Sequence, residues 1–327
     1  MAQDAYLELA RRLEYPPSPR LLHILKKMAS PEEARVLLEL PGEPAGIGRR
    51  LGMSGRTVKA AVKDLWRRGL AYDRGKGLEF APNLPILHFC LGGSADFVDA
   101  KLLRLWREFF EGEWSQVIPD RWETLKRRMG EVVPAARALD GLPDVQPEED
   151  IRQIIGGAEV LAVVPCACRR PLRKCEAALD NCLVVDDFAR DILKKGWGKR
   201  VSVKKALALT EEAEALGLVH MTARMGGTLA FLCNCCGDCC HILYPGLRRG
   251  NLTKVIDRCR FRAAVDPERC TGCQDCIERC LFGAISLRRF SGAKKWKAVV
   301  DAGKCFGCGL CVVGCEPHAA RLVLPAA

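Results

Sequence analysis

The sequence predicts an α+β protein built of several domains. Its 327 residues suit two or three domains, the first third shows helical periodicity with almost no cysteine, and most of the nineteen cysteines gather in two later segments. We therefore expect four parts: an N-terminal domain at 1–90, a helical connector and linker at 91–147, a cysteine-rich α/β domain at 148–258, and a small cysteine-rich domain at 259–327.

The N-terminal part is predicted to form three helices followed by a hairpin. Helical patterns cover 31–40 and 43–51, Gly52 supplies a turn, and Ser54 is placed to cap a third helix through Arg68. Residues 69–80 then read as a small hairpin with Gly75, Lys76 and Gly77 at its tip. Three helices followed by a hairpin resemble a winged helix-turn-helix domain.

The third predicted helix has an apolar side and a basic side. The apolar side consists of Val58, Val62, Leu65 and Trp66, and the basic side of Arg56, Lys59, Lys63 and Arg67. In a DNA-binding protein such a basic stripe neutralises phosphates. A solvated helix face, or a surface that docks an acidic partner protein, explains the same pattern, and fold alone does not decide between them.

In the connector, Ser94 is expected to cap a long helix through Phe110, and residues 141–147 form the clearest linker. The cysteine-rich segment after it alternates helical and strand patterns. We expect helices at 148–155, at 184–193 and, capped by Ser202, up to Ala215, with strands at 160–165, 218–221 and 228–232. The turn between the last two strands is expected at 224–227, and a second chain break at 244–250.

Nine cysteines lie in this central segment, and two of the predicted strands lead directly into them. They are Cys166, Cys168, Cys175, Cys182, Cys233, Cys235, Cys236, Cys239 and Cys240. Nine ligands are too many for one cluster and enough for two, so we expect one or two [4Fe–4S] clusters here. Zinc and unligated or redox-active thiols are the alternatives. Adjacent cysteines point to opposite sides of an extended chain, which leaves the pairing of ligands open.

The C-terminal part contains one cysteine pattern twice. Both copies read C-x2-C-x2-C-x3-C, which is the ligand spacing of two [4Fe–4S] clusters in which the fourth cysteine of each copy binds the other cluster. The expected ligands are Cys270, Cys273, Cys276 and Cys315 for one cluster and Cys305, Cys308, Cys311 and Cys280 for the other. Two four-thiolate zinc sites are the alternative, but zinc normally takes separated cysteine pairs.

Residues 265–324 closely resemble a bacterial-type ferredoxin with two [4Fe–4S] clusters. Gly272 and Gly307 follow that pattern between the first two cysteines of each copy, whereas Leu281 replaces the proline that usually follows the fourth cysteine. Residues 20–327 also resemble the multi-cluster 4Fe–4S ferredoxin-domain proteins of anaerobic bacteria and archaea, through Val-Val-Pro-Cys-x-Cys-Arg and Cys-x-Cys-Cys-Gly-x-Cys-Cys. This resemblance implies electron transfer and names no reaction.

Four further residues have a less specific pattern. Cys90 lies in an apolar stretch and is expected to be a core residue, and Cys259 is expected to be a lone buried thiol. His241, next to Cys240, is expected to serve as a cap or core residue, with iron ligation as the alternative. His318 is a candidate for a hydrogen bond to cluster sulfide.

The net charge and the expected cell compartment limit the functions that fit the sequence. Each [4Fe–4S]2+ core with four thiolates carries −2, so two clusters reduce the formal charge of +11 to about +7 and four reduce it to about +3. The basic excess alone is therefore a weak indication of nucleic-acid binding. No secretory or twin-arginine signal and no apolar run of membrane-spanning length is evident, so we expect a reducing cytoplasm in which cysteines bind metal.

The sequence thus favours an iron–sulfur electron-transfer protein that serves a partner oxidoreductase complex, since no nucleotide-binding glycine motif is evident. A redox-sensing DNA-binding regulator is the alternative function. A third interpretation, in which an open iron site makes a central cluster catalytic, also stays open.

Overall fold

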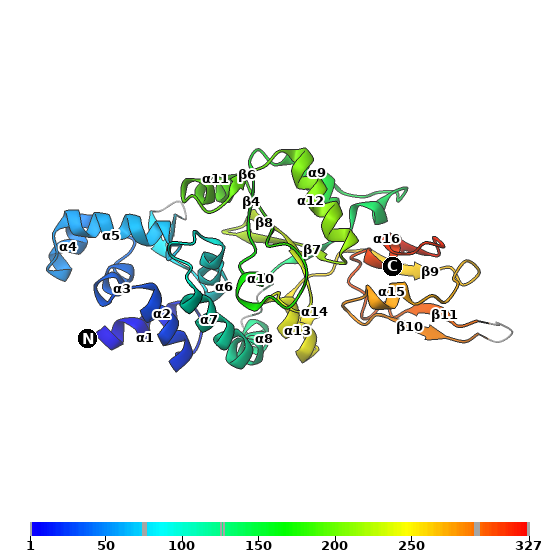
Figure 1. Ribbon diagram of the computed structural model, residues 1–327, viewed down its shortest axis with the longest axis horizontal. Coiled ribbons are helices and arrows are strands. Elements are labelled where there is room, and N and C mark those ends of the chain that lie inside the picture. The colour runs from blue at the N-terminus through cyan, green and yellow to red at the C-terminus, as the bar shows by residue number, and fades with distance from the viewer. Residues whose placement is uncertain (1, 74–76, 125, 127, 291–294, 326–327) are drawn as a thin grey trace.

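The chain is elongated, with N-terminal helices at one end and two small C-terminal sheets at the other (Figure 1). This computed structural model describes residues 2–73, 77–124, 126, 128–290 and 295–325. Helices and small antiparallel sheets alternate along it, which confirms the α+β class. Among the described helices, none combines the length and apolar character needed to span a membrane.

The first ninety residues are mainly helical, and they include two helices that precede the three expected from the sequence. The elements are α1 (Ala2–Arg12), α2 (Pro19–Met28), α3 (Pro31–Leu38), α4 (Pro44–Leu51), α5 (Gly55–Arg67), β1 (Ala71–Asp73), β2 (Leu78–Phe80), α6 (Leu84–His88) and η1 (Phe89–Gly92). Ser54 caps α5 by accepting a hydrogen bond from the Thr57 amide, as expected. The strands β1 and β2 pair as the expected hairpin, and two residues of the predicted tip, Gly75 and Lys76, lie outside the described residues.

The connector helix begins later than expected. Asp99, not Ser94, caps α7 (Ala100–Phe109) through the Leu102 amide, whereas the Ser94 hydroxyl bonds Asp96. The chain then continues through the π-helical turn η2 (Phe110–Trp114) into α8 (Ser115–Thr124). After it, β3 (Glu131–Val133) pairs with the central sheet, so part of the expected connector belongs structurally to the central segment.

A six-stranded antiparallel sheet organises the central segment. Its strand order is β3-β7-β8-β5-β4-β6, and the five strands after β3 are β4 (Leu161–Pro165), β5 (Asp180–Val185), β6 (Lys199–Arg200), β7 (Val219–Met225) and β8 (Thr228–Cys235). The accompanying helices are η3 (Ala136–Leu139), η4 (Pro147–Glu149), α9 (Ile151–Gly157), α10 (Arg169–Leu172), α11 (Asp186–Lys194), α12 (Val203–Ala215), α13 (Leu243–Arg249) and α14 (Leu252–Val255).

Two expectations for the central segment are wrong in part. Val184 and Val185 end strand β5 instead of starting a helix, because these β-branched residues pair with β4 and β8. The expected break at 244–250 is largely helix α13, which ends at Gly250 with a positive φ. The helix capped by Ser202 and the hairpin of β7 and β8 are confirmed.

The central sheet has two different faces. Helices α9 and α12 cover one face, and alternate strand residues pack beneath them in a separate apolar cluster: Val133, Leu161, Leu183, Val185 and Leu232. The intervening residues point to the other face and join the main core, among them Ala162, Val164, Cys182, Val184 and Phe231. Cys182 on β5 and Cys233 and Cys235 on β8 alternate with the residues beneath α9 and α12. These cysteines therefore lie on the opposite face of the sheet.

Helix α5 and strand β1 of the N-terminal part pack against the central segment around Lys195. The Trp66 indole donates to the Asp191 carboxylate at 2.8 Å, and the Trp197 indole donates to the Arg67 carbonyl at 2.8 Å. The buried ammonium of Lys195 pairs with Asp191 at 2.7 Å and lies 5.2 Å from the Trp197 ring centroid. These contacts fix the end of α5 against α11.

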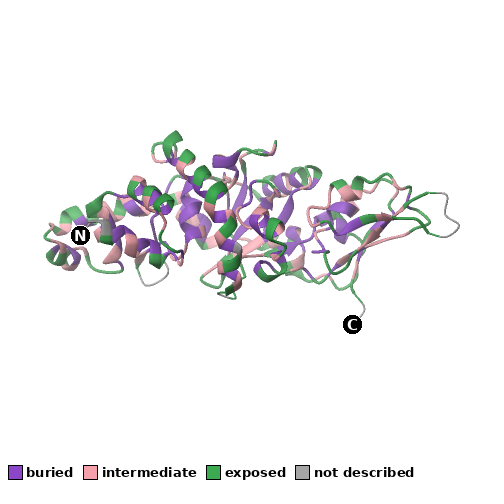
Figure 2. Cartoon of the chain, turned by 90° about the horizontal axis from the view of Figure 1, so that it is seen from below, coloured by how far each residue is buried: buried purple, intermediate pink, exposed green. Residues whose placement is uncertain are grey.

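The C-terminal segment consists of two small antiparallel pairs and two short helices. Strand β9 (Arg262–Val265) pairs with β12 (Ala320–Val323), and β10 (Ile285–Arg288) pairs with β11 (Lys297–Val300); α15 (Asp275–Glu278) and α16 (Leu310–Val313) lie between them in sequence. Figure 2 shows buried residues concentrated in the N-terminal and central parts, while this segment is more exposed. So small an apolar core suggests that its cysteines contribute to its stability when they bind metal.

Candidate metal centres

The eight C-terminal cysteines gather around two separate cavities, four at each. Cys270, Cys273, Cys276 and Cys315 line the first C-terminal cavity, and Cys280, Cys305, Cys308 and Cys311 line the second. Each cavity therefore takes three cysteines from one copy of the repeat and one from the other. These are the two groups of four that the spacing predicts, while the bound group stays a prediction.

Backbone amides point at the sulfurs of both cavities in matching positions. The Ala298 amide donates to Cys270 Sγ at 3.4 Å, and the Ala263 amide donates to Cys305 Sγ at 3.4 Å. The fourth cysteines receive similar bonds, from the Ala284 amide to Cys280 and the Ala319 amide to Cys315, at 3.3 and 3.2 Å. Such bonds stabilise a thiolate and tune the potential of an iron–sulfur centre.

Glycine is required between the first two cysteines of each copy. Gly272 and Gly307 have φ values of 78° and 76°. A Cβ at Gly272 would lie 2.4 Å from the Trp296 carbonyl oxygen, and one at Gly307 would lie 2.3 Å from that of Phe261. At Gly307 the Cys259 sulfur lies 2.2 Å from the same Cβ position, so neither glycine has room for a side chain.

Burial raises the pKa values of three C-terminal thiols. Burial raises the pKa of Cys276 to about 11 and that of Cys311 to about 12, and burial raises the pKa of Cys308 well above its ordinary value. Metal binding at these cavities therefore releases protons, since thiolate is the ligating form.

The sheet positions the central cysteines on one face, where they line a cavity of about 540 Å³, the central cavity. Leu183 on β5 and Leu232 on β8 form a cross-strand pair. Cys182 precedes Leu183 and Cys233 follows Leu232 on these antiparallel strands, so the two cysteines are neighbours. Cys235 lies two residues further along β8 and points the same way. Strand β4 ends at Pro165 and delivers Cys166 beside them, as the sequence predicts.

Six of the central thiols are neighbours, and we call them the six-cysteine group: Cys166, Cys168, Cys182, Cys233, Cys235 and Cys240. Each of these thiols interacts with at least two others of the group. Interaction with the neighbouring thiols lowers the pKa values of Cys166, Cys233 and Cys240 and raises those of Cys168, Cys182 and Cys235.

The other three central cysteines form their own group. The sulfurs of Cys175, Cys236 and Cys239 all lie within 4.8 Å of one another. Cys235 and Cys236 thus belong to different groups, and so do Cys239 and Cys240. The pairing that the sequence left open is therefore one in which adjacent cysteines belong to different groups.

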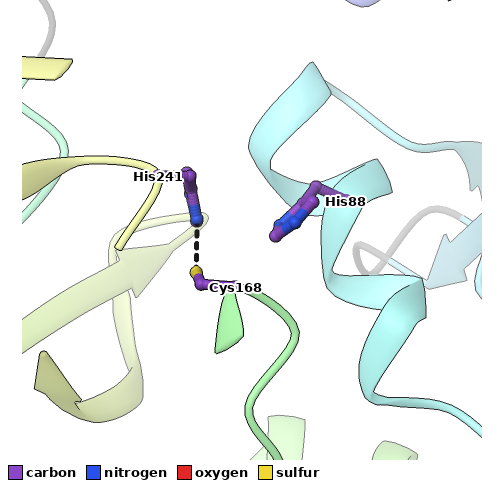
Figure 3. A group of neighbouring side chains, drawn as sticks. All are labelled: His88, Cys168 and His241. Atoms are coloured by element: carbon purple, nitrogen blue, oxygen red, sulfur yellow. Dashed lines mark hydrogen bonds between the residues drawn. The ribbon is translucent and has the colours of Figure 1, made fainter. Parts of the chain in front are cut away.

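Two histidines adjoin the six-cysteine group at Cys168 (Figure 3). His241 Nδ1 lies 2.6 Å from Cys168 Sγ, and the ring centroids of His241 and His88 are 4.8 Å apart. Their ligand atoms and the Cys168 sulfur all lie within 4.8 Å of one another. Burial lowers the pKa values of both histidines, which keeps the imidazoles in the neutral, metal-binding form.

His88 brings the N-terminal part of the chain to this group, because it ends helix α6. Its side chain is buried, and its Nδ1 atom has no hydrogen-bond partner among the described residues. An orphaned nitrogen beside a thiol is consistent with a metal-ligating imidazole. Sequence reasoning did not single out His88; a histidine inside the apolar run 86–91 was the available signal.

Arg169 holds the central cysteines in place through a buried network. Its guanidinium, 1% exposed, donates to Cys175 Sγ at 3.1 Å, to Asn181 Oδ1 at 2.7 Å and to the Asn234 carbonyl at 3.2 Å. Asn234 in turn donates to the Asn181 carbonyl at 2.9 Å and contacts His220 at 2.7 Å. Buried polar groups of this kind orient ligands.

The central cavity is much larger than either C-terminal cavity. The central cavity has a volume of about 540 Å³, whereas each C-terminal cavity has a volume of about 20 Å³. The C-terminal cavities thus enclose little more than the space between four sulfurs. The volume of the central cavity is larger than the space that its cysteines would need to hold one cluster.

The remaining sequence candidates have simple environments. Cys90 is buried, as expected. Cys259 is also buried, and its thiol donates to the Phe306 carbonyl at 3.3 Å, which supports the lone-thiol interpretation. His241 contacts Cys168 instead of serving only as a cap. His318 is exposed, and its backbone amide donates to the Cys315 carbonyl at 2.9 Å.

Comparisons with protein-family models, with curated proteins and with solved structures return no match for this chain.

Proposed function

We propose that the chain is an iron–sulfur electron-transfer protein that serves a partner oxidoreductase. In this proposal the C-terminal segment is a two-cluster ferredoxin-like domain, and the central segment holds a further [4Fe–4S] cluster in the six-cysteine group. The N-terminal segment is a winged-helix-like domain. A [4Fe–4S] cluster accepts and releases one electron at a time.

One observation carries the proposal. Two cavities each gather four cysteines, three from one copy of the repeat and one from the other. A cubane needs one thiolate at each of four separate irons, so its sulfurs stand further apart than those around a single ion. Consistent with this, no three ligand atoms within 4.8 Å of one another are found among the eight cysteines, all of which the structure describes.

The two C-terminal cavities differ in their surroundings. Cys273, at the first, is exposed, whereas the backbone carbonyl of Cys308, at the second, accepts a hydrogen bond from the Ala135 amide at 2.9 Å. Arg279 donates hydrogen bonds to the Leu310 carbonyl within the C-terminal segment and to the Glu214 carbonyl of α12 in the central segment. The exposed first cavity suits contact with a soluble partner, and the second is fastened to the central segment.

A redox titration tests the proposal. Anaerobically purified protein is reduced stepwise while electron paramagnetic resonance spectra are recorded. We expect one-electron signals from at least two interacting C-terminal clusters and from a central one, and transfer of those electrons to a viologen dye. Protein that shows no paramagnetic iron–sulfur signal at any potential, although it is folded and loaded with iron and sulfide, would rule the proposal out.

The exposed basic face of α5 favours a second function, that of a redox-sensing DNA-binding regulator. Arg56, Lys59 and Lys63 are exposed, and the described part of the chain provides no ion pair for them. Against this function, the last turn of α5 is fastened to α11 through Trp66. We expect duplex DNA to bind weakly, with no loss of binding in the variant Lys59→Glu/Lys63→Glu. Binding that the variant abolishes, and that depends on cluster oxidation, would favour the regulator.

A further inference from the structure

Cys175, Cys236 and Cys239 form a compact three-sulfur group at the edge of the central cavity. The sulfurs of Cys175 and Cys239 are 3.9 Å apart, and all three lie within 4.8 Å of one another. Cys236 and Cys239 are buried, and Cys175 is half-buried. Three thiols from two distant chain segments therefore converge on a point in the interior of the protein.

The separation of these sulfurs matches a single tetrahedral ion. With zinc–sulfur bonds of about 2.3 Å, neighbouring sulfurs around a tetrahedral zinc ion stand about 3.8 Å apart. The C-terminal cysteines provide an internal comparison, because none of those eight belongs to a described group of three ligand atoms within 4.8 Å. Within one chain, the compact group and the two spread groups thus have the geometries of different metal centres.

The local sequence and backbone also suit zinc. Cys236 and Cys239 form a C-x2-C pair around Gly237 and Asp238, a spacing typical of zinc sites. The Cys239 amide donates to Cys236 Sγ at 3.3 Å, and the Lys174 amide donates to Cys239 Sγ at 3.4 Å. Hydrogen bonds of this kind orient the ligands of a metal and offset their charge.

The guanidinium of Arg169 completes the surroundings of the three-sulfur group. It is buried and donates to Cys175 Sγ at 3.1 Å. Three thiolates and one Zn²⁺ carry a net charge of −1, which this cation offsets. Calcium and magnesium prefer oxygen ligands, whereas thiolates bind zinc, and zinc outcompetes ferrous iron at such sites.

We propose that Cys175, Cys236 and Cys239 bind one zinc ion, separate from the six-cysteine group. No fourth cysteine, histidine or carboxylate joins them among the residues that the structure describes, so one tetrahedral position is left for a ligand from outside the chain. Zinc sites with three protein ligands and one exchangeable position are typical of catalytic centres. The site does not depend on the proposed electron-transfer function.

Metal analysis tests the zinc site. Full-length protein is purified anaerobically, without chelators, and zinc and iron per chain are measured by mass spectrometry. We expect about one zinc in the unaltered protein, and almost none in Cys236→Ser/Cys239→Ser, with iron unchanged. The matched control is Cys90→Ser, which removes a buried thiol outside all four cysteine groups and should retain both metals.

A milder variant separates loss of zinc from loss of the fold. Cys175→Ser changes a half-buried position, and retention of the C-terminal iron–sulfur signals reports that the variant is folded. We expect its zinc content to fall at least fivefold. Zinc K-edge absorption of the unaltered protein should show three sulfurs and one lighter atom.

The outcomes separate the two proposals. If Cys236→Ser/Cys239→Ser and Cys175→Ser lose about four irons and the unaltered protein contains no zinc, the group binds a cluster and the zinc site is wrong, while the electron-transfer proposal stands. Zinc that survives both variants, or a shell of four sulfurs, would also overturn the site. Absence of iron with one zinc retained would contradict only the electron-transfer proposal.

Discussion

The two cysteine-rich regions differ in how their ligands are brought together. In the C-terminal segment, three of every four cysteines lie within seven consecutive residues, so one short loop can surround one centre. In the central segment, Cys166, Cys182 and Cys233 come from three separate strands or strand ends, and only the sheet register makes them neighbours. Sequence spacing therefore reveals a metal centre when its ligands are local, and loses that power when the fold assembles them.

The regions also differ in what accompanies the sulfurs. The C-terminal cavities are lined mainly by cysteines, glycines and apolar residues, with backbone amides as donors. Their polar lining residues are Thr271, Gln274 and Asp275 at the first cavity and Arg279 at the second. The central cavity is lined by two imidazoles, the buried guanidinium of Arg169 and the three carboxamides of Asn83, Asn181 and Asn234. Each buried polar group needs a hydrogen-bond partner, so these side chains are available to orient the central cysteines.

The largest effect that separates the regions is expected from Cys308→Ser. It removes a ligand of the second C-terminal cavity, so we expect about four irons per chain to be lost while the central iron is retained. Iron analysis and the paramagnetic spectrum of the central cluster check this. Cys259→Ser, a change at a buried thiol of the same segment, is the control and should lose none. Equal loss of iron from all sites would show that the regions are not independent.

The protonation of the thiols provides a second contrast, measurable on folded, metal-free protein. The hydrogen bond from Cys239 lowers the pKa of Cys236 to about 5, whereas burial raises the pKa of Cys311 to about 12. Cys236 is thus a thiolate at all pH values above about 5, and Cys311 becomes one only as the pH rises toward 12. We expect alkylation at pH 7 to favour Cys236 at least a hundredfold.

Mass spectrometry of the alkylated peptides between pH 4 and 10 measures that contrast. The modification of Cys236 should fall as the pH falls through 5, and that of Cys311 should rise steadily to the end of the range. Similar pH profiles for the two cysteines would contradict the expected difference in their surroundings.

Arg169→Met should destabilise the central segment by about 3 kcal/mol, because it leaves Asn181 Oδ1 and the Asn234 carbonyl without their buried donor. Chemical unfolding followed by the fluorescence of Trp197, the tryptophan of the central segment, measures this. The exposed neighbour Arg173, changed to Met, should shift stability by less than about 0.5 kcal/mol. Equal effects of the two changes would show that the network adds nothing.

The smallest effect is expected from His88→Ala. If His88 binds the central centre through nitrogen, the reduced protein labelled with 15N-histidine should show a nitrogen hyperfine coupling that this variant weakens, with iron content unchanged. His23→Ala, at an exposed position of α2, is the matched control. An identical coupling in both variants would assign His88 to packing alone.

Local signals in the sequence predicted much of the fold. Ser54 and Ser202 cap helices as expected, because each side chain reaches the amide three residues later. Ser94 failed as a cap because Asp99 competes for the same helix and lies closer to its first turn. The strand residues Val184 and Val185 were misassigned to a helix, since a short apolar run carries no decisive period.

The site was predictable to the extent that it is local. The two C-terminal groups of four follow from the repeat, and the structure gathers the same residues. The division of the central cysteines into six and three, and the approach of His88 from α6, depend on the register of β5 against β8 and on the packing of the N-terminal part. The spacing of the cysteines in the sequence predicts neither of them.

The central claim, that this chain carries several iron–sulfur clusters, is tested most directly by counting iron and acid-labile sulfide per chain in anaerobically purified protein. The account predicts about twelve of each, eight from the C-terminal cavities and four from the six-cysteine group, together with one zinc. About eight irons would confine the clusters to the C-terminal segment. Zinc without sulfide would contradict the claim, and the cysteine groups would then be zinc sites.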